Sequence, residues 1–271
     1  MDELRTAVGI LTGEMRGILR EKLHSVWLYG SVVMDDFRPG WSDIDFIALT
    51  GSPPTAAEAE QLLPLRQALS ARYPGRPFFR CFEGITASLE EYRTGSFTRL
   101  VYWGTTGQRI TDRHTDDPFA RFELARAGER VHGDGDRRIF AEPGTAELTA
   151  AVRRHYETIR TYAVQTDGTL YACGWLLDMA RCIYTLRHHG VIAKTRAGEW
   201  ALEEHVFPDE EALRRTLEIR RDPPRFRDLP ETKRWLADLG PTVQRCADVL
   251  EDELARSDRP GKQKGLQKAS T

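Results

Sequence analysis

The sequence predicts an α+β fold, in which a small mixed sheet with helices is followed by an all-α helical bundle. Two observations lead to this prediction. Short apolar runs typical of strands lie in the first half of the chain, at 26–29, 43–49 and 78–88. After residue 145 no convincing strand remains, and apolar residues recur every three or four positions, as in amphipathic helices.

The length of 271 residues and the hydrophobic content of 40% allow two cores and hence two domains. We expect the first domain at 1–140 and a helical domain at 141–256. Between them the composition changes, at the Gly- and Asp-rich segment 132–136 and again at 142–145. The end of the chain, 257–271, has little apolar content, so we expect it to be disordered and without a catalytic role.

The elements of the first domain follow from periodicity and from breaks at proline and glycine. Leu4, Val8, Leu11 and Met15 recur at helical spacing and predict an amphipathic helix over 3–24. The expected elements after it are a strand at 26–29, a short helix after a Gly-Ser pair, a strand at 43–49, a helix over 56–72 that can kink at Pro64, a strand at 78–88, a hairpin at 99–112 and a helix over 118–127.

The second domain should be a bundle of about five helices, several of them ended by proline or glycine. Their expected bounds are 145–166, 170–188, 195–205, 209–220 and 229–254.

Charge and composition exclude several classes of protein. The net charge of −2 provides no general attraction for nucleic acid, so nucleic acid is not an expected partner. No apolar run reaches about 18 residues and no charged-then-apolar leader is seen, which predicts a soluble cytoplasmic protein without a membrane partner. The four cysteines are scattered without a CxxC pair, which favours free thiols over a zinc site or disulfides.

The most informative segment for function is 28–49, LYGSVVMDDFRPGWSDIDFIAL. Side chains alternate along a strand, so Asp43 and Asp45 are expected on the same side of the sheet. Two neighbouring carboxylates repel each other, an arrangement that a divalent cation between them stabilises. Gly30 and Ser31 can offer backbone N–H groups and a hydroxyl to a phosphate. The pattern therefore indicates phosphoryl or nucleotidyl transfer; the alternative is an ordinary β-turn-β with a surface acidic pair.

Gly-Ser followed by Asp-x-Asp at this separation resembles the nucleotidyltransferase superfamily related to DNA polymerase β. Over most of residues 1–210 the chain resembles the aminoglycoside adenylyltransferases that modify streptomycin and spectinomycin. The segments that carry this resemblance are 28–49, with its Ser42-Asp-Ile-Asp block, RCFEGIT at 80–86, 131–148 and 179–202. The resemblance implies a polymerase-β-like domain followed by a helical domain that binds ATP and the acceptor.

Glu83 is the third expected carboxylate. It stands inside the apolar strand FFRCFEGIT, where an unpaired glutamate would be costly to bury. If this strand lies beside the Asp-x-Asp strand, Glu83 joins Asp43 and Asp45 as catalytic residues and ligands of Mg²⁺. By resemblance, Glu83 is the general base for the acceptor hydroxyl. The alternative is an edge-strand glutamate that faces solvent.

The resemblance also implies residues that bind ATP and the acceptor. Gly30, Ser31 and Ser42 belong to the phosphate-binding block, and Lys194 resembles the family's ATP-contacting lysine. Arg181 is a second candidate for the phosphates, with an interhelical ion pair as the alternative.

A polycationic acceptor calls for acids and aromatics, which the family places at the interdomain cleft. Asp167 falls at one of two aspartate positions of the family, whereas Tyr171 replaces the other, which puts streptomycin itself in doubt. Asp178 can serve instead, or it can pair with Arg181 one turn away. Trp103 is a candidate stacking wall, or an aromatic core residue.

These observations lead to one main hypothesis: transfer of AMP from ATP, with Mg²⁺ as cofactor, to a hydroxyl of a small cationic acceptor, releasing pyrophosphate. We expect a monomer. The alternatives keep the chemistry but change the acceptor to a protein, a tRNA end or a biosynthetic metabolite, or make the chain a catalytically silent nucleotide-binding module.

Overall fold

The structure is a computed structural model that describes residues 2–104 and 107–259. Contacts within the chain divide it into two compact units, Met1–Phe37 with Ser42–Glu142, and Arg38–Trp41 with Pro143–Thr271. Assignment of a separate function to each domain stays a prediction. Of the predicted disordered tail, residues 260–271 lie outside the described residues.

The first unit is built on a six-stranded mixed sheet with the strand order β5-β4-β3-β2-β1-β6. Strands β2 and β3 are parallel, and every other neighbouring pair is antiparallel. This confirms the predicted fold of the first half. The strands are β1 (Leu23–Tyr29), β2 (Ile44–Thr50), β3 (Phe82–Ser88), β4 (Leu100–Gly104), β5 (Gly107–Thr111) and β6 (Glu129–Gly133).

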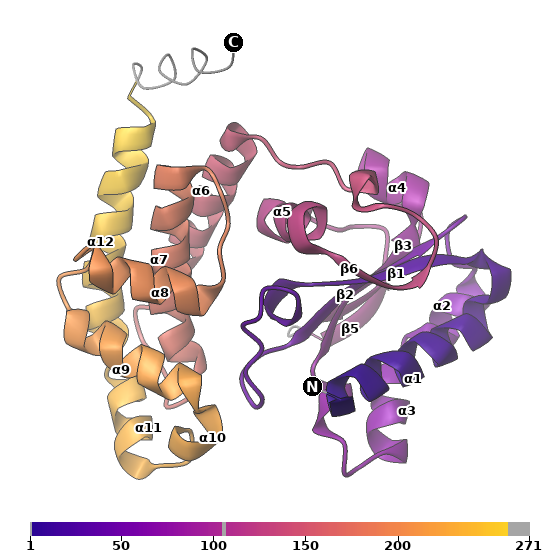
Figure 1. Ribbon diagram of the computed structural model, residues 1–271, viewed down its shortest axis with the longest axis horizontal. Helices are drawn as coiled ribbons and strands as arrows, with labels where there is room; N and C mark the ends of the chain where they lie inside the picture. The colour runs from indigo at the N-terminus through magenta and orange to yellow at the C-terminus, as the bar shows by residue number, and fades with distance from the viewer. Residues whose placement is uncertain (1, 105–106, 260–271) are drawn as a thin grey trace. The chain divides into compact units, whose positions relative to one another are not determined.

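Helices cover both faces of this sheet (Figure 1). On one face, α1 (Asp2–Leu19), α2 (Ala56–Leu62) and α3 (Leu65–Arg72) pack on a core that includes Phe46 and Ala48. On the other face, α5 (Pro118–Ala127) packs on a smaller core that includes Ile47 and Leu49. The alternation along β2 therefore assigns odd-numbered residues of this strand to the α5 face.

Several predicted bounds change for local reasons. The first helix ends at Leu19, because Arg20 has a φ of 52° and starts a 3₁₀ turn, Arg20–Lys22. Pro64 separates two helices, α2 and α3, whereas the sequence predicts one helix with a possible kink at this residue. Pro77 opens another 3₁₀ turn, Pro77–Arg80, so β3 begins only at Phe82.

Two short elements of the first unit, α4 (Leu89–Thr94) and the edge strand β6, are not among those that the sequence predicts. Strand β6 is rich in charged residues, has no fully buried side chain and is recognisable only through its pairing with β1.

The second unit is all-α, as predicted. Its described residues form seven helices: α6 (Thr145–Tyr162), α7 (Tyr171–His188), α8 (Lys194–Glu203), α9 (Glu210–Arg221), α10 (Pro223–Phe226), α11 (Pro230–Ala237) and α12 (Gly240–Ser257). Helix α7 is central, since it contacts α6, α8, α9, α11 and α12.

The helix predicted over 229–254 is two helices, α11 and α12. The new helix begins at Gly240-Pro241, where the backbone N–H of Gly240 donates to Thr166 Oγ1 at 3.1 Å. A Cβ at Gly240 would lie 2.3 Å from the carbonyl oxygen of Val164, so only glycine allows this close packing.

No helix in the described part of the chain combines the length and the apolar character needed to cross a membrane.

We expect Gly84→Ala to destabilise the first unit, because a Cβ there would lie 1.9 Å from the backbone oxygen of Phe46 on the neighbouring strand. Overpacking of this kind costs about 1–3 kcal/mol. The matched control is Gly13→Ala on α1, where nothing lies within 4 Å of the added Cβ and helix propensity rises. Urea unfolding midpoints measure both variants, and equal midpoints would contradict the register of β2 and β3.

Candidate active site

The turn that follows β1 lies directly against the carboxylate of Asp45. Gly30 has a φ of 68°, and its carbonyl accepts the backbone N–H groups of Val33 and Met34 at 3.2 and 3.1 Å. A Cβ on Gly30 would lie 2.1 Å from Asp45 Oδ2. Both the backbone conformation and the lack of space therefore require glycine at this position.

Asp45 lies at the start of β2 and is paired on both sides. It is opposite Tyr29 of antiparallel β1 and opposite Glu83 of parallel β3. Side chains of directly paired residues point to the same face, and neighbouring strands are about 4.8 Å apart. The structure thus brings Asp45 and Glu83 side by side on the α5 face, and both are half-buried.

Asp43 differs from its predicted position, because β2 begins only at Ile44. The alternation argument therefore does not apply to Asp43, which is exposed and precedes the strand. Its backbone is held near the Gly-Ser turn, since Ser31 Oγ donates to the Asp43 carbonyl at 3.3 Å. Ser42, the residue before it, is buried.

Burial and the carboxylates at this edge of the sheet raise the pKa of two nearby groups. Burial and then the charge of Asp45 raise the pKa of Tyr29 well above its ordinary value, with further contributions from Glu123 and Asp117. Burial and then the charge of Asp43 raise the pKa of the Cys81 thiol, and Glu83 acts in the same direction.

These groups fit a magnesium ion that binds together with a phosphate. Among the residues that the structure describes, no three His, Cys, Asp or Glu side chains form a group that could hold a metal ion by themselves. The predicted trio of Asp43, Asp45 and Glu83 is therefore not a preassembled metal cage. Mg²⁺ typically uses one or two carboxylates and completes its shell with water and substrate phosphate oxygens. Carboxylates beside the Gly30 turn are suited to that arrangement.

In the second unit, Asp178 on α7 is paired with two cations. Lys194, the first residue of α8, places Nζ 2.9 Å from Asp178 Oδ1, and Arg181 Nη2 lies 3.3 Å from the same oxygen. Burial by itself would raise the pKa of Asp178. The nearby charges outweigh this effect, Lys194 most, then Arg181 and His155, and lower the pKa to about 2. The ion pair that the sequence allowed is thus present, and Asp178 is not available as a free acid for the acceptor.

The other predicted acceptor residues have different positions. Trp103 is 2% exposed and packs at 5.4 Å, edge to face, on Phe46 in the core of the first unit. It cannot serve as a stacking wall, because the core covers both faces of its ring. Tyr171, in contrast, is 65% exposed at the start of α7 and lies edge-on to Trp175. Asp167 precedes it and accepts the backbone N–H of Thr169 at 3.0 Å.

Two residues near the Gly30 turn, Tyr29 and Glu123, are not predicted from the sequence. Tyr29 is paired with Asp45, and Glu123 contributes to the raised pKa of Tyr29, after burial and Asp45. Tyr29 immediately precedes Gly30, at the end of β1. The antiparallel pairing of the two strands would have placed it opposite Asp45. Glu123 is 6% exposed on α5, and nothing in the segment PFARFELARA distinguishes it from a surface residue.

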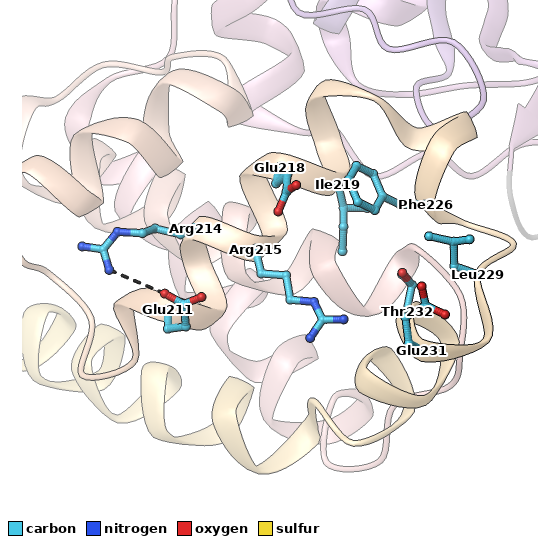
Figure 2. A pocket seen from close by; sticks show the side chains of 9 residues that line it. All are labelled: Glu211, Arg214, Arg215, Glu218, Ile219, Phe226, Leu229, Glu231 and Thr232. Atoms are coloured by element: carbon cyan, nitrogen blue, oxygen red, sulfur yellow. Dashed lines mark ion pairs between the residues drawn. The ribbon is translucent and has the colours of Figure 1, made fainter.

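The second unit contains a hollow of about 380 Å³ (Figure 2). It is formed by α9, α10, α11 and their connections, with Ile219 and Phe226 together at one end and the ion pair of Arg214 with Glu211 at the other. It contains none of the predicted site residues.

The comparisons with known proteins agree with this geometry. Residues 138–235 match the family model of the aminoglycoside adenylyltransferase C-terminal domain. Among solved structures, the chain is similar to spectinomycin adenyltransferase AAD(9) from Enterococcus faecialis with ATP and spectinomycin, at a TM-score of 0.64 and 17% sequence identity. This similarity covers 89% of the present chain and 97% of AAD(9), so the two share a fold.

No curated protein matches the chain by sequence. The family match over residues 138–235 and the shared fold agree with the resemblance that the sequence indicated.

Acid should remove the stabilisation that Asp178 provides. Folding lowers the pKa of its carboxyl from 3.8 to about 2, so its contribution is complete above pH 4 and is lost as the pH falls towards 2. The shift corresponds to about 2 kcal/mol. Free energies of unfolding at a series of pH values should fall less steeply in this window for Asp178→Asn than for the wild type. Parallel curves would contradict the assignment.

Proposed function

We propose that this protein transfers AMP from ATP to a hydroxyl of an aminoglycoside-type molecule in a Mg²⁺-dependent reaction that releases pyrophosphate. The observation that carries this proposal is the assembly of the Gly30 turn with Asp45 and Glu83, which lie on adjacent strands. It joins a phosphate-binding turn to two carboxylates within the fold shared with AAD(9). The match of residues 138–235 to the family's C-terminal domain supports the choice of acceptor class.

Each group has a role that its chemistry supports. The N–H groups of the Gly30 turn and the Ser31 hydroxyl would bind the β- and γ-phosphates. Mg²⁺, when bound by Asp43 and Asp45, would neutralise charge on the α-phosphate and on the leaving pyrophosphate. Lys194 and Arg181 would contact phosphate oxygens, where positive charge is most useful as pyrophosphate departs.

Glu83 would act as the general base. Its carboxylate accepts the proton of the acceptor hydroxyl, whose oxygen then forms a bond to the α-phosphorus. The bond between the α-phosphorus and the bridging oxygen breaks, and pyrophosphate leaves in line with the attacking oxygen. The position of Glu83 next to Asp45 supports this role, since a base must lie within reach of the phosphate under attack.

The acceptor is proposed to be a cationic small molecule. The neighbour AAD(9) was solved with spectinomycin. In the present chain, Asp167 offers a carboxylate and Tyr171 an exposed ring near the start of α7, and these are the groups that attract ammonium-bearing ligands.

The first test is product formation. Purified protein incubated with Mg²⁺, ATP labelled in the α-phosphate and a panel containing spectinomycin and streptomycin should yield a labelled AMP–drug adduct and pyrophosphate. Label in a protein or RNA would instead support a macromolecular acceptor. ATP binding without any labelled product would overturn the proposed transfer.

The second test removes one charge at a time from the first unit. Asp45→Asn and Glu83→Gln should each lower kcat by about a hundredfold or more, because positioning and proton transfer supply most of the rate. Glu83→Gln should leave the Kd for ATP close to that of the wild type. The matched control is Glu90→Gln, an exposed carboxylate on α4 that should keep full activity. Turnover near wild type in Asp45→Asn would sink the mechanism.

A further inference from the structure

The carboxylate of Asp178 is shared by two cations that come from different helices. Lys194 Nζ is 2.9 Å from Oδ1 and 3.2 Å from Oδ2, so it lies across both oxygens. Arg181, one turn further along α7, donates to Oδ1 at 3.3 Å. The Asp178 side chain is only 16% exposed, which limits the screening of these interactions by solvent.

We propose that Asp178 is a positioning residue that holds Lys194 and Arg181 side by side for the triphosphate of ATP. It contacts neither ATP nor the acceptor. This inference rests on the proposed function, because it takes these two cations to be phosphate ligands.

The physical reason is the repulsion between two like charges on flexible side chains. Without a carboxylate between them, Lys194 and Arg181 would separate and recover rotamer freedom in solvent. With Asp178 in place the two cations stay together, and the three groups keep one net positive charge. The net positive charge favours the binding of a phosphate. Because the two cations are already held in place, less side-chain entropy is lost when the phosphate binds.

The other two lysines that precede residue 260 have simpler surroundings. Lys22 pairs at 2.7 Å with Glu58, the carboxylate that also caps α2, and Lys233 pairs at 3.3 Å with the exposed Asp228. Asp228 also pairs with Arg227, at 3.5 Å, but its side chain is 76% exposed. Of these three lysines, Lys194 is the one whose partner is a mostly buried carboxylate that also binds an arginine, which is the arrangement expected for a site that gathers positive charge.

Glu253 provides a control of the same chemistry. Its Oε1 accepts from Arg187 at 2.5 Å and from Arg256 at 2.8 Å, and its side chain is 9% exposed. It too is a mostly buried carboxylate shared by two cations, and it joins α7 to α12 in the same unit. No role in ATP binding is assigned to it.

The test compares Asp178→Asn with Glu253→Gln by calorimetric titration with ATP and Mg²⁺ in the absence of acceptor. An asparagine has one acceptor oxygen and turns an NH₂ group towards the second cation. We expect the Kd for ATP to rise about tenfold in Asp178→Asn, because the loss of one charge-assisted hydrogen bond changes affinity by about this factor. Glu253→Gln should leave this Kd within about twofold of wild type, even where both variants lower the melting temperature.

Steady-state kinetics add a readout that a purely structural role would not change. The KM for ATP should rise in Asp178→Asn while the KM for the acceptor stays the same, and Asp178→Glu should recover part of the loss. Removal of a negative charge would by itself strengthen ATP binding. Tighter ATP binding in Asp178→Asn, or a higher KM for the acceptor alone, would therefore overturn the inference.

A double-mutant cycle tests whether Asp178 acts through Lys194. In the Lys194→Met background, Asp178→Asn should weaken ATP binding less than it does in the wild type. Additive effects would overturn the positioning role. If Lys194→Met binds ATP as well as the wild type, the proposed ATP contact of Lys194 fails and this inference fails with it. If Lys194→Met binds ATP weakly but Asp178→Asn binds normally, only this inference fails.

Discussion

The close approach of the Gly30 turn to the Asp45 carboxylate is the constraint on which the candidate active site depends. The turn has no room for a side chain, and its backbone conformation is one that L-residues avoid. Antiparallel pairing sets Tyr29 opposite Asp45, so the end of β1 and the start of β2 meet at the same edge of the sheet. Backbone N–H groups and a carboxylate, which attract a phosphate and a metal ion respectively, thereby become neighbours.

Parallel pairing of β2 with β3 adds Glu83 to this edge. A parallel connection requires a crossover, which α2 and α3 supply, and it brings a residue far along the chain into register with Asp45. The groups proposed for nucleotidyl transfer therefore come from two different parts of the chain. The turn proposed to bind phosphate and the Asp-x-Asp pair come from one local segment, whereas the proposed base comes from the neighbouring strand.

The helical unit uses charge differently. Its Lys194, Arg181 and Asp178 form a compact group with net positive charge, and the exposed Tyr171 and Asp167 stand near the start of the same helix, α7. The hollow of Figure 2 is lined by other elements, α9 to α11, and its arginines are engaged with Glu211 and with the ring of Trp235. None of the residues predicted to bind ATP or the acceptor lines this hollow.

Much of the fold could be predicted because its signals are local. The period of apolar residues indicated α1, α6 and α7, and proline and glycine indicated most of the breaks. The errors arose where a signal was weak or depended on partners. Strand β6 is half-exposed and charged, and the break at Gly240 is stabilised by contact with the α6–α7 connection. Trp103 could equally have been a surface aromatic, and only packing on Phe46 decided between the two.

The sequence by itself determined which chemistry is proposed for the site, because Gly30, Ser31, Asp43 and Asp45 lie in one short segment whose spacing can be read directly from the chain. The tertiary structure alone decided which distant groups join them and which do not. It brought Glu83 beside Asp45, buried Trp103, and turned Asp178 from a candidate acceptor contact into the partner of Lys194 and Arg181. The physical reason is that side-chain spacing follows from local backbone geometry, whereas strand register and the pairing of buried charges depend on contacts between residues far apart in the chain.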